Sequence, residues 1–248
     1  MNTEENNSKT DTINVLTTIL VILLAAIPTL EILMRFFFKT GITASYTIIR
    51  HIVLWVAFVG SYLASKTGSH LSIEAGKKYI PERFIAKVGL FSRVVEVSVL
   101  TGFLVSSVSF IFIAFASHEK TGIINTRILV SVIPLCFAAM VFYLFHDILK
   151  AGKKINPYTA VFAAVTALFF AVILSITPIV NLFHIQLADP PVFLDDIFDK
   201  AVIVISSFKL PAVIILIVSG MLGTPIFIVL GGITYILLSA TGGYTEIA

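Results

Sequence analysis

The stretch RHIVLWVAFVG (residues 50–60) sets the character of this chain, because after Arg50 and His51 it contains only apolar residues and glycine. It lies within a longer apolar run, residues 44–65. A helix needs about 20 predominantly apolar residues to cross the hydrocarbon core of a bilayer. The run is therefore predicted to be a membrane-spanning helix.

The whole chain has the composition of an integral membrane protein. Of its 248 residues, 58% are hydrophobic and 12% are charged, and the mean hydropathy is +1.02. Soluble domains carry about 25% charged residues. The basic residues cluster between apolar runs, which favours membrane topology over nucleic-acid binding. A single cysteine, Cys136, excludes a disulfide framework and any multi-cysteine metal site.

Six apolar runs are long enough to span a bilayer, so the expected fold class is all-α, a polytopic helical membrane protein. They cover residues 13–38, 44–65, 88–116, 123–149, 157–183 and 210–240. The first run is predicted to be a retained anchor rather than a cleaved signal. The last run is interrupted at Gly223-Thr224-Pro225, where we expect a kink; the alternative is a broken helix with exposed backbone groups.

The positions of the basic residues predict the orientation of the spans. Lys and Arg are frequent in residues 66–87 and 150–154, which are therefore expected to be cytoplasmic. This places the N-terminus inside and the aspartate-rich residues 189–199 outside. Two short amphipathic helices are expected at the interfaces, one after Pro81 and one over residues 193–205 that Pro211 should end.

Charged residues inside apolar runs are costly and tend to be paired. Glu31 and Arg35 lie four apart on one helix face, which favours a structural ion pair; a contact with a partner subunit is the alternative. Arg93 and Glu96, three apart, are also expected to pair. His146 and Asp147 lie at an inner helix end, where hydration accounts for them.

The histidines and the short motifs give no sign of an enzyme. His51 is expected to hydrogen-bond to another helix, with haem ligation as the alternative. His118-Glu119-Lys120 lacks the second histidine of a zinc-protease helix. The chain also has no Gly-x-Ser-x-Gly elbow and no phosphate-binding Gly-x-x-x-x-Gly-Lys loop. Carriers, channels, scaffolds and haem anchors remain as classes of function.

Small residues recur every four positions on two of the runs. They are Ala57, Ser61 and Ser65 on the second, and Ser98, Gly102 and Ser106 on the third. Such spacing lets membrane helices approach closely. These faces are therefore predicted to pack against protein.

Three features of the first part of the chain occur together in a known family. They are a charged pair near the end of the first helix, an arginine–tryptophan–glycine pattern in the second, and a histidine before an apolar residue: Glu31, Arg35, Arg50, Trp55, Gly60 and His70. This part resembles the Q-type small membrane subunit of tripartite ATP-independent periplasmic (TRAP) transporters. The acidic residue that usually precedes the arginine is absent here, and Thr47 stands near its place.

The later sequence SGMLGTPIFIVLGG (residues 219–232) is similar to the opening helix of the large M-type subunit of the same transporters, with Gly223 and Pro225 as its Gly-x-Pro. The resemblance implies three parts. Residues 1–155 would be a four-helix Q-type unit and residues 156–186 a connector helix. Residues 187–248 would hold an interfacial helix and the first helix of a truncated M-type unit.

The resemblance also implies a function. The chain would be the small scaffold component of a sodium-coupled importer of organic acids in the bacterial inner membrane. Its partners would be a large M-type permease subunit and a periplasmic solute-binding protein; the sodium sites would lie in the large subunit, and this chain would need no cofactor. The alternatives are a self-contained small carrier or channel, and a redox-enzyme anchor that binds b-type haem through His51 and His184.

Overall fold

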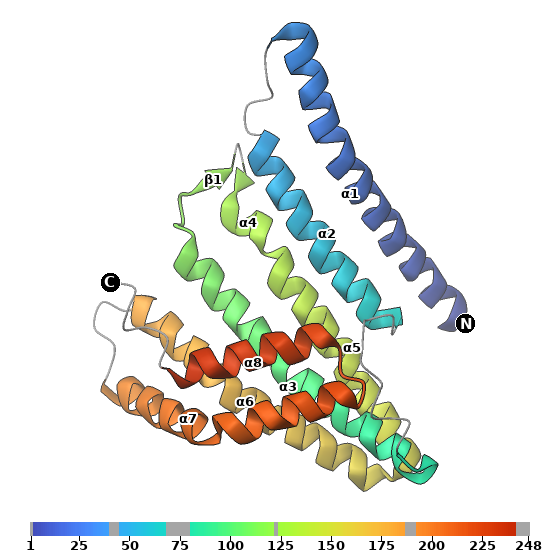
Figure 1. Ribbon diagram of the computed structural model, residues 1–248, viewed down its shortest axis with the longest axis vertical. Coiled ribbons are helices and arrows are strands. Elements are labelled where there is room, and N and C mark those ends of the chain that lie inside the picture. The colour runs from blue at the N-terminus through green and yellow to red at the C-terminus, as the bar shows by residue number, and fades with distance from the viewer. Residues whose placement is uncertain (1, 40–44, 68–79, 122–123, 187–191, 242–248) are drawn as a thin grey trace.

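The computed structural model describes residues 2–39, 45–67, 80–121, 124–186 and 192–241, and these form a helical protein (Figure 1). Six of the described helices are long and apolar enough to cross a membrane. The expected all-α polytopic fold is thereby confirmed. The elements, in order, are α1 (Asn2–Phe38), α2 (Ser45–Thr67), α3 (Glu82–Ala114), β1 (Lys120–Thr121), β2 (Ile124–Asn125), α4 (Thr126–Val130), α5 (Val132–Ile155), α6 (Pro157–Gln186), α7 (Val192–Met221) and α8 (Ile226–Ala240).

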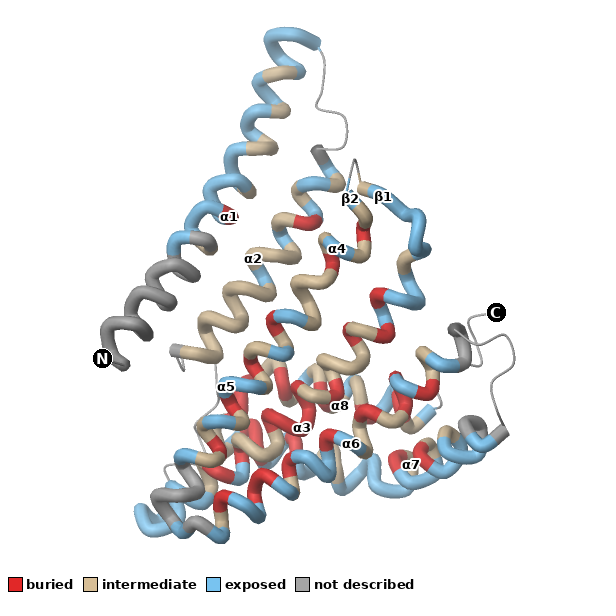
Figure 2. Tube along the Cα trace, turned by 180° about the vertical axis from the view of Figure 1, so that it is seen from behind, coloured by how far each residue is buried: buried red, intermediate tan, exposed pale blue. Residues whose placement is uncertain are grey.

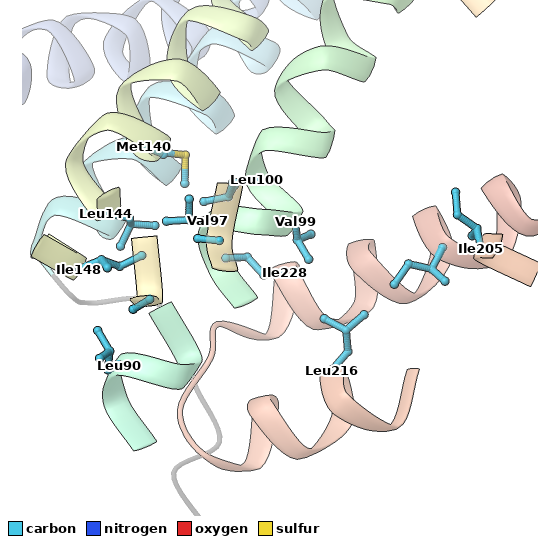
Figure 3. Packing of buried hydrophobic residues seen from close by; sticks show 13 residues of the cluster. Leu90, Val97, Val99, Leu100, Met140, Leu144, Ile148, Ile205, Leu216 and Ile228 are labelled. Atoms are coloured by element: carbon cyan, nitrogen blue, oxygen red, sulfur yellow. The ribbon is translucent and has the colours of Figure 1, made fainter. Parts of the chain in front are cut away.

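The core lies where α3 packs against α5 and α6. Figure 3 shows Val97 and Leu100 of α3 close to Met140 of α5, and all three side chains are fully buried. The small residues of α3 make this packing close, as predicted. The Ser98 hydroxyl lies 2.8 Å from the Val94 carbonyl and 3.2 Å from the Ala167 carbonyl of α6.

The helices α1 and α2 form an arm beside this core. Helix α1 packs against α2, and α2 packs in turn against α5. Figure 2 shows that most of the described part of α1 is exposed, and Leu20 is its one buried hydrophobic residue there. The strands β1 and β2, each of two residues, pair antiparallel, and β2 leads directly into α4.

The two interfacial helices expected from the sequence are not separate elements. Helix α3 begins at Glu82, directly after Pro81, and continues to Ala114 without a turn. Helix α7 continues from Val192 through Pro211 to Met221. Proline removes one backbone donor, and apolar helices of membrane proteins tolerate this loss. The expectation that Pro211 ends a flat outer helix was therefore wrong.

The expected kink at Gly223 is also wrong, because the chain reverses there. Gly223 has φ 109°, and Thr224 N–H and Gly223 N–H donate to the carbonyls of Ser219 and Gly220. This pair of bonds is the Schellman pattern that ends a helix at a left-handed glycine. Helices α7 and α8 consequently lie side by side as a hairpin (Figure 1). Helix α8 has 15 residues, which is about 22 Å and too short to span a bilayer of about 30 Å.

Candidate subunit interface

The charged pair near the end of α1 forms as predicted. Arg35 Nη2 and Nε donate to Glu31 Oε1 over 2.6 and 3.1 Å. The Arg35 side chain is 68% exposed and that of Glu31 only 16%. A residue pair four apart on a helix shares one face, so the sequence alone places this contact. The Arg35 side chain therefore stays exposed although it is paired with Glu31.

The first turns of α2 place Arg50 and His51 in different surroundings. Arg50 is exposed, whereas His51 is buried. His51 Nδ1 lies 2.8 Å from the Thr47 carbonyl, to which it must donate because a carbonyl only accepts. This bond runs within α2. For Nδ1, the expected hydrogen bond to another helix is therefore replaced by a bond to the backbone carbonyl four residues earlier.

Trp55 ties the arm to the rest of the molecule. Its indole Nε1 donates to the Leu129 carbonyl of α4 over 2.7 Å. Tryptophan has a donor and no acceptor, so this contact fixes the orientation of the ring. One turn and a half further along α2, a Cβ built on Gly60 would meet no atom within 4 Å. The face of α2 at Gly60 is therefore open, whereas Trp55 faces protein.

Arg127 of α4 was not singled out from the sequence, although it holds the end of α3. Its Nε donates to the Phe115 carbonyl over 2.8 Å, and its Nη2 to the Phe112 carbonyl over 3.3 Å. Its guanidinium lies 5.2 Å from the centre of the Phe112 ring. The last carbonyls of a helix lack intrahelical donors. The sequence feature that could have identified Arg127 is a basic residue just after a short loop.

A second contact missed by the sequence joins α3 to α5. Arg93 forms an ion pair with Asp147, and their side chains are 37% and 30% exposed. The sequence predicted Glu96 as the partner of Arg93; Glu96 is buried on the same helix, and this second pairing stays a prediction. The expectation that hydration alone accounts for Asp147 was wrong. Its partner is 54 positions away in the chain, and no local spacing could indicate it.

Residues 24–154 match the family model described as the DctQ component of tripartite ATP-independent periplasmic transporters. This range is more than half of the chain. The chain belongs to the DctQ family of TRAP transporter components. Neither a curated protein nor a solved structure matches it. As a DctQ component it is a non-enzymatic membrane subunit of a transporter, in agreement with the lack of catalytic motifs.

The DctQ match begins within α1, covers α2, α3 and α4, and ends within α5, at its last residues. It includes Glu31, Arg35, Arg50, Trp55 and Gly60. The Q-type resemblance is confirmed for this part. The roles of these five residues as interface or structural residues stay predictions, because the structure shows only the contacts described above.

The remaining predicted positions lie outside the DctQ match or outside the described residues. His70 belongs to residues 68–79, which the structure does not describe, and the side chain of His184 is likewise not described. Gly223 and Pro225 form the turn between α7 and α8, where Pro225 is buried. Among the described residues no group of three or more His, Cys, Asp or Glu side chains could hold a metal ion.

Proposed function

We propose that this DctQ chain is the small scaffold subunit of a sodium-coupled TRAP importer of organic acids. A large M-type permease subunit would carry the solute and sodium sites, and a periplasmic solute-binding protein would deliver the solute. The family supports the tripartite assembly. The choice of organic acids and of sodium as the coupling ion rests on the resemblance to TRAP transporters.

The observation that carries the scaffold role is the packing of the arm. Helix α1 is long enough to span the membrane, yet it packs mainly against α2 and exposes large side chains such as Phe36, Phe37 and Ile32. In a membrane, such faces meet lipid or the helices of another subunit. The exposed Arg35 and the open face at Gly60 lie on the same arm and are offered as contacts for the large subunit.

The experiment is reconstitution of the chain in liposomes with an inward sodium gradient and labelled organic acids. We expect no uptake by the chain alone, and uptake when the large subunit and its binding protein are added. Uptake by the isolated chain would show that it is a self-contained carrier.

The exposed Arg50 is proposed to hold the large subunit without choosing the solute. Arg50→Ala should reduce co-purification of the large subunit and leave the order of preferred solutes unchanged. Lys200→Ala, on the exposed side of α7, is the matched control and should leave co-purification intact. An Arg50→Ala complex that assembles normally but prefers a different solute would refute this role.

We further propose that residues 156–186, which include α6, form a connector, and that α7 and α8 are the start of an M-type part. The basic ends of α3 and α5 would be cytoplasmic. Cysteines introduced at Lys150 and at Lys200 test this arrangement. A membrane-impermeant thiol reagent added from outside should label the second site and spare the first; labelling of the first alone would reverse the orientation.

A further inference from the structure

Pro178 interrupts the backbone hydrogen bonds of α6. It lies inside the helix, and proline has no N–H to donate to the carbonyl four residues before it, here Leu174. In the hydrocarbon region a backbone carbonyl without a donor is costly, so it takes one from a neighbouring helix, a side chain or water. The Leu174 carbonyl is therefore left without its helical donor and can accept from a neighbouring group.

Helix α8 supplies a donor at this point. The Tyr235 hydroxyl donates to the Leu174 carbonyl. The ring reaches that carbonyl across Gly102 of α3, where an added Cβ would lie 3.1 Å from Tyr235 Cε1. Phe103 packs edge-on to the same ring, with the ring centres 5.9 Å apart.

Two neighbouring glycines bring α8 close enough for this contact. A Cβ on Gly231 would lie 2.7 Å from Phe103 Cζ, and one on Gly232 would lie 3.2 Å from a methyl carbon of Val99. Both neighbours belong to α3. The hydroxyl of Tyr235 and the small residues beside it thus form one face of α8, fitted to α3 and α6.

We propose that the Leu174 carbonyl freed by Pro178, together with the gap at Gly102, is a docking socket whose occupant is the Tyr235-bearing face of the α7–α8 hairpin. Tyr235 is a positioning residue, because its hydroxyl replaces the donor that Pro178 lacks. The inference rests on the proposed function only in assigning the hairpin to the M-type part. In the assembled transporter the socket is then the joint between scaffold and permease.

The proposal predicts that Tyr235 and Pro178 act as a pair. With alanine at position 178, the backbone N–H returns and can satisfy the Leu174 carbonyl. The hydroxyl of Tyr235 is then no longer needed as the hydrogen-bond donor to the Leu174 carbonyl. Removing that hydroxyl should therefore weaken the docking of α8 in the natural chain and have little effect in the Pro178→Ala chain.

The test measures docking by disulfide formation between Val99→Cys on α3 and Gly232→Cys on α8, in full-length chain with Cys136→Ala, in membranes under a mild oxidant. Tyr235→Phe should lower the initial cross-linking rate about three- to tenfold, as expected for one interhelical hydrogen bond in a membrane. With Pro178→Ala, the same substitution should change the rate less than twofold. Tyr158→Phe, which removes an exposed hydroxyl at the start of α6, is the matched control and should have no effect.

Each other outcome is also decisive. Equal effects of Tyr235→Phe in both backgrounds would overturn the proposal and assign the hydroxyl to its other hydrogen-bonding neighbours, Ser106 and Ser239. If Pro178→Ala does not accumulate, an unchanged rate for Tyr235→Phe alone still overturns it. The measurement needs no large subunit, so failed co-purification would refute the proposed function and leave the docking intact.

Discussion

Two regions of the molecule are both apolar but differ in how far their side chains are buried. One consists of the central helices α3, α5, α6 and α8, and the other is the α1–α2 arm. In the central helices, residues such as Leu100 and Ile148 are fully buried, and glycines admit neighbouring rings. In the described part of α1, only Leu20 is a buried hydrophobic residue. Apolar composition suits both regions to a membrane, and packing with small residues marks the faces of the central helices that meet protein within this chain.

The largest effect is expected at the turn between α7 and α8, which lies in the central region. A Cβ on Gly220 would lie 3.8 Å from the Val229 Cβ, which is the usual Cβ separation in a disulfide. Gly220→Cys with Val229→Cys, in a Cys136→Ala chain, should cross-link almost completely on oxidation, measured by mass spectrometry of the linked peptides.

A continuous helix would separate these two positions by about 13 Å and would prevent the bond. The control pair has the same spacing in the continuous helix α1, Val21→Cys with Leu30→Cys, and should remain reduced within each chain. Absence of the Gly220–Val229 cross-link would favour the single kinked helix expected from the sequence.

Two glycines contrast the regions directly. Gly231→Ala places a Cβ 2.7 Å from Phe103 Cζ, and such overpacking costs about 1–3 kcal/mol of the free energy of unfolding. Gly60→Ala meets no atom and should stabilise the isolated chain by about 0.5–1 kcal/mol, because alanine loses less backbone entropy in a helix. Unfolding in mixed micelles measures both.

The same pair distinguishes the chain from its complex. If Gly60→Ala is harmless to the isolated chain but reduces co-purification of the large subunit, the open face of the arm is a subunit contact. An equal loss of stability in both variants would mean that the arm is packed as closely as the centre.

The join between the two regions should have a smaller effect. Trp55→Phe keeps an aromatic ring and removes the bond from Nε1 to the Leu129 carbonyl, which should lower the free energy of unfolding by about 0.6–1.7 kcal/mol. Tyr143→Phe removes an exposed hydrogen bond of 3.2 Å to the Lys66 carbonyl and should change stability less. The opposite order would show that the indole bond does not hold the arm.

The smallest effect is expected at the Arg93–Asp147 pair. About a third of each side chain is exposed, so solvent screens the interaction, and a double-mutant cycle with Arg93→Gln and Asp147→Asn should give a coupling of about 0.5–1 kcal/mol. The Lys200–Asp196 pair is more exposed and should give less. Coupling at Arg93 that does not decline with added salt would contradict this account.

The sequence by itself determined the features that depend on neighbours along the chain. Long apolar runs are sufficient to predict membrane helices, because the bilayer fixes their length. The spacing of Glu31 and Arg35 predicts their ion pair, since both lie on one helix face. Ser98 and Gly102 predict a packed face, and the Arg50–Gly60 pattern leads to the family that the DctQ match confirms.

Only the tertiary structure decided which distant groups meet. Proline stands at both position 211 and position 225, yet α7 continues through the first, and the chain reverses just before the second. The difference lies in Gly223, whose positive φ ends the helix, and in the fit of α8 against α3. The partners of Arg93 and Tyr235 likewise lie far along the chain. Hydrogen bonds in an apolar medium are satisfied by whichever group packing brings near, and that choice is not encoded in local spacing.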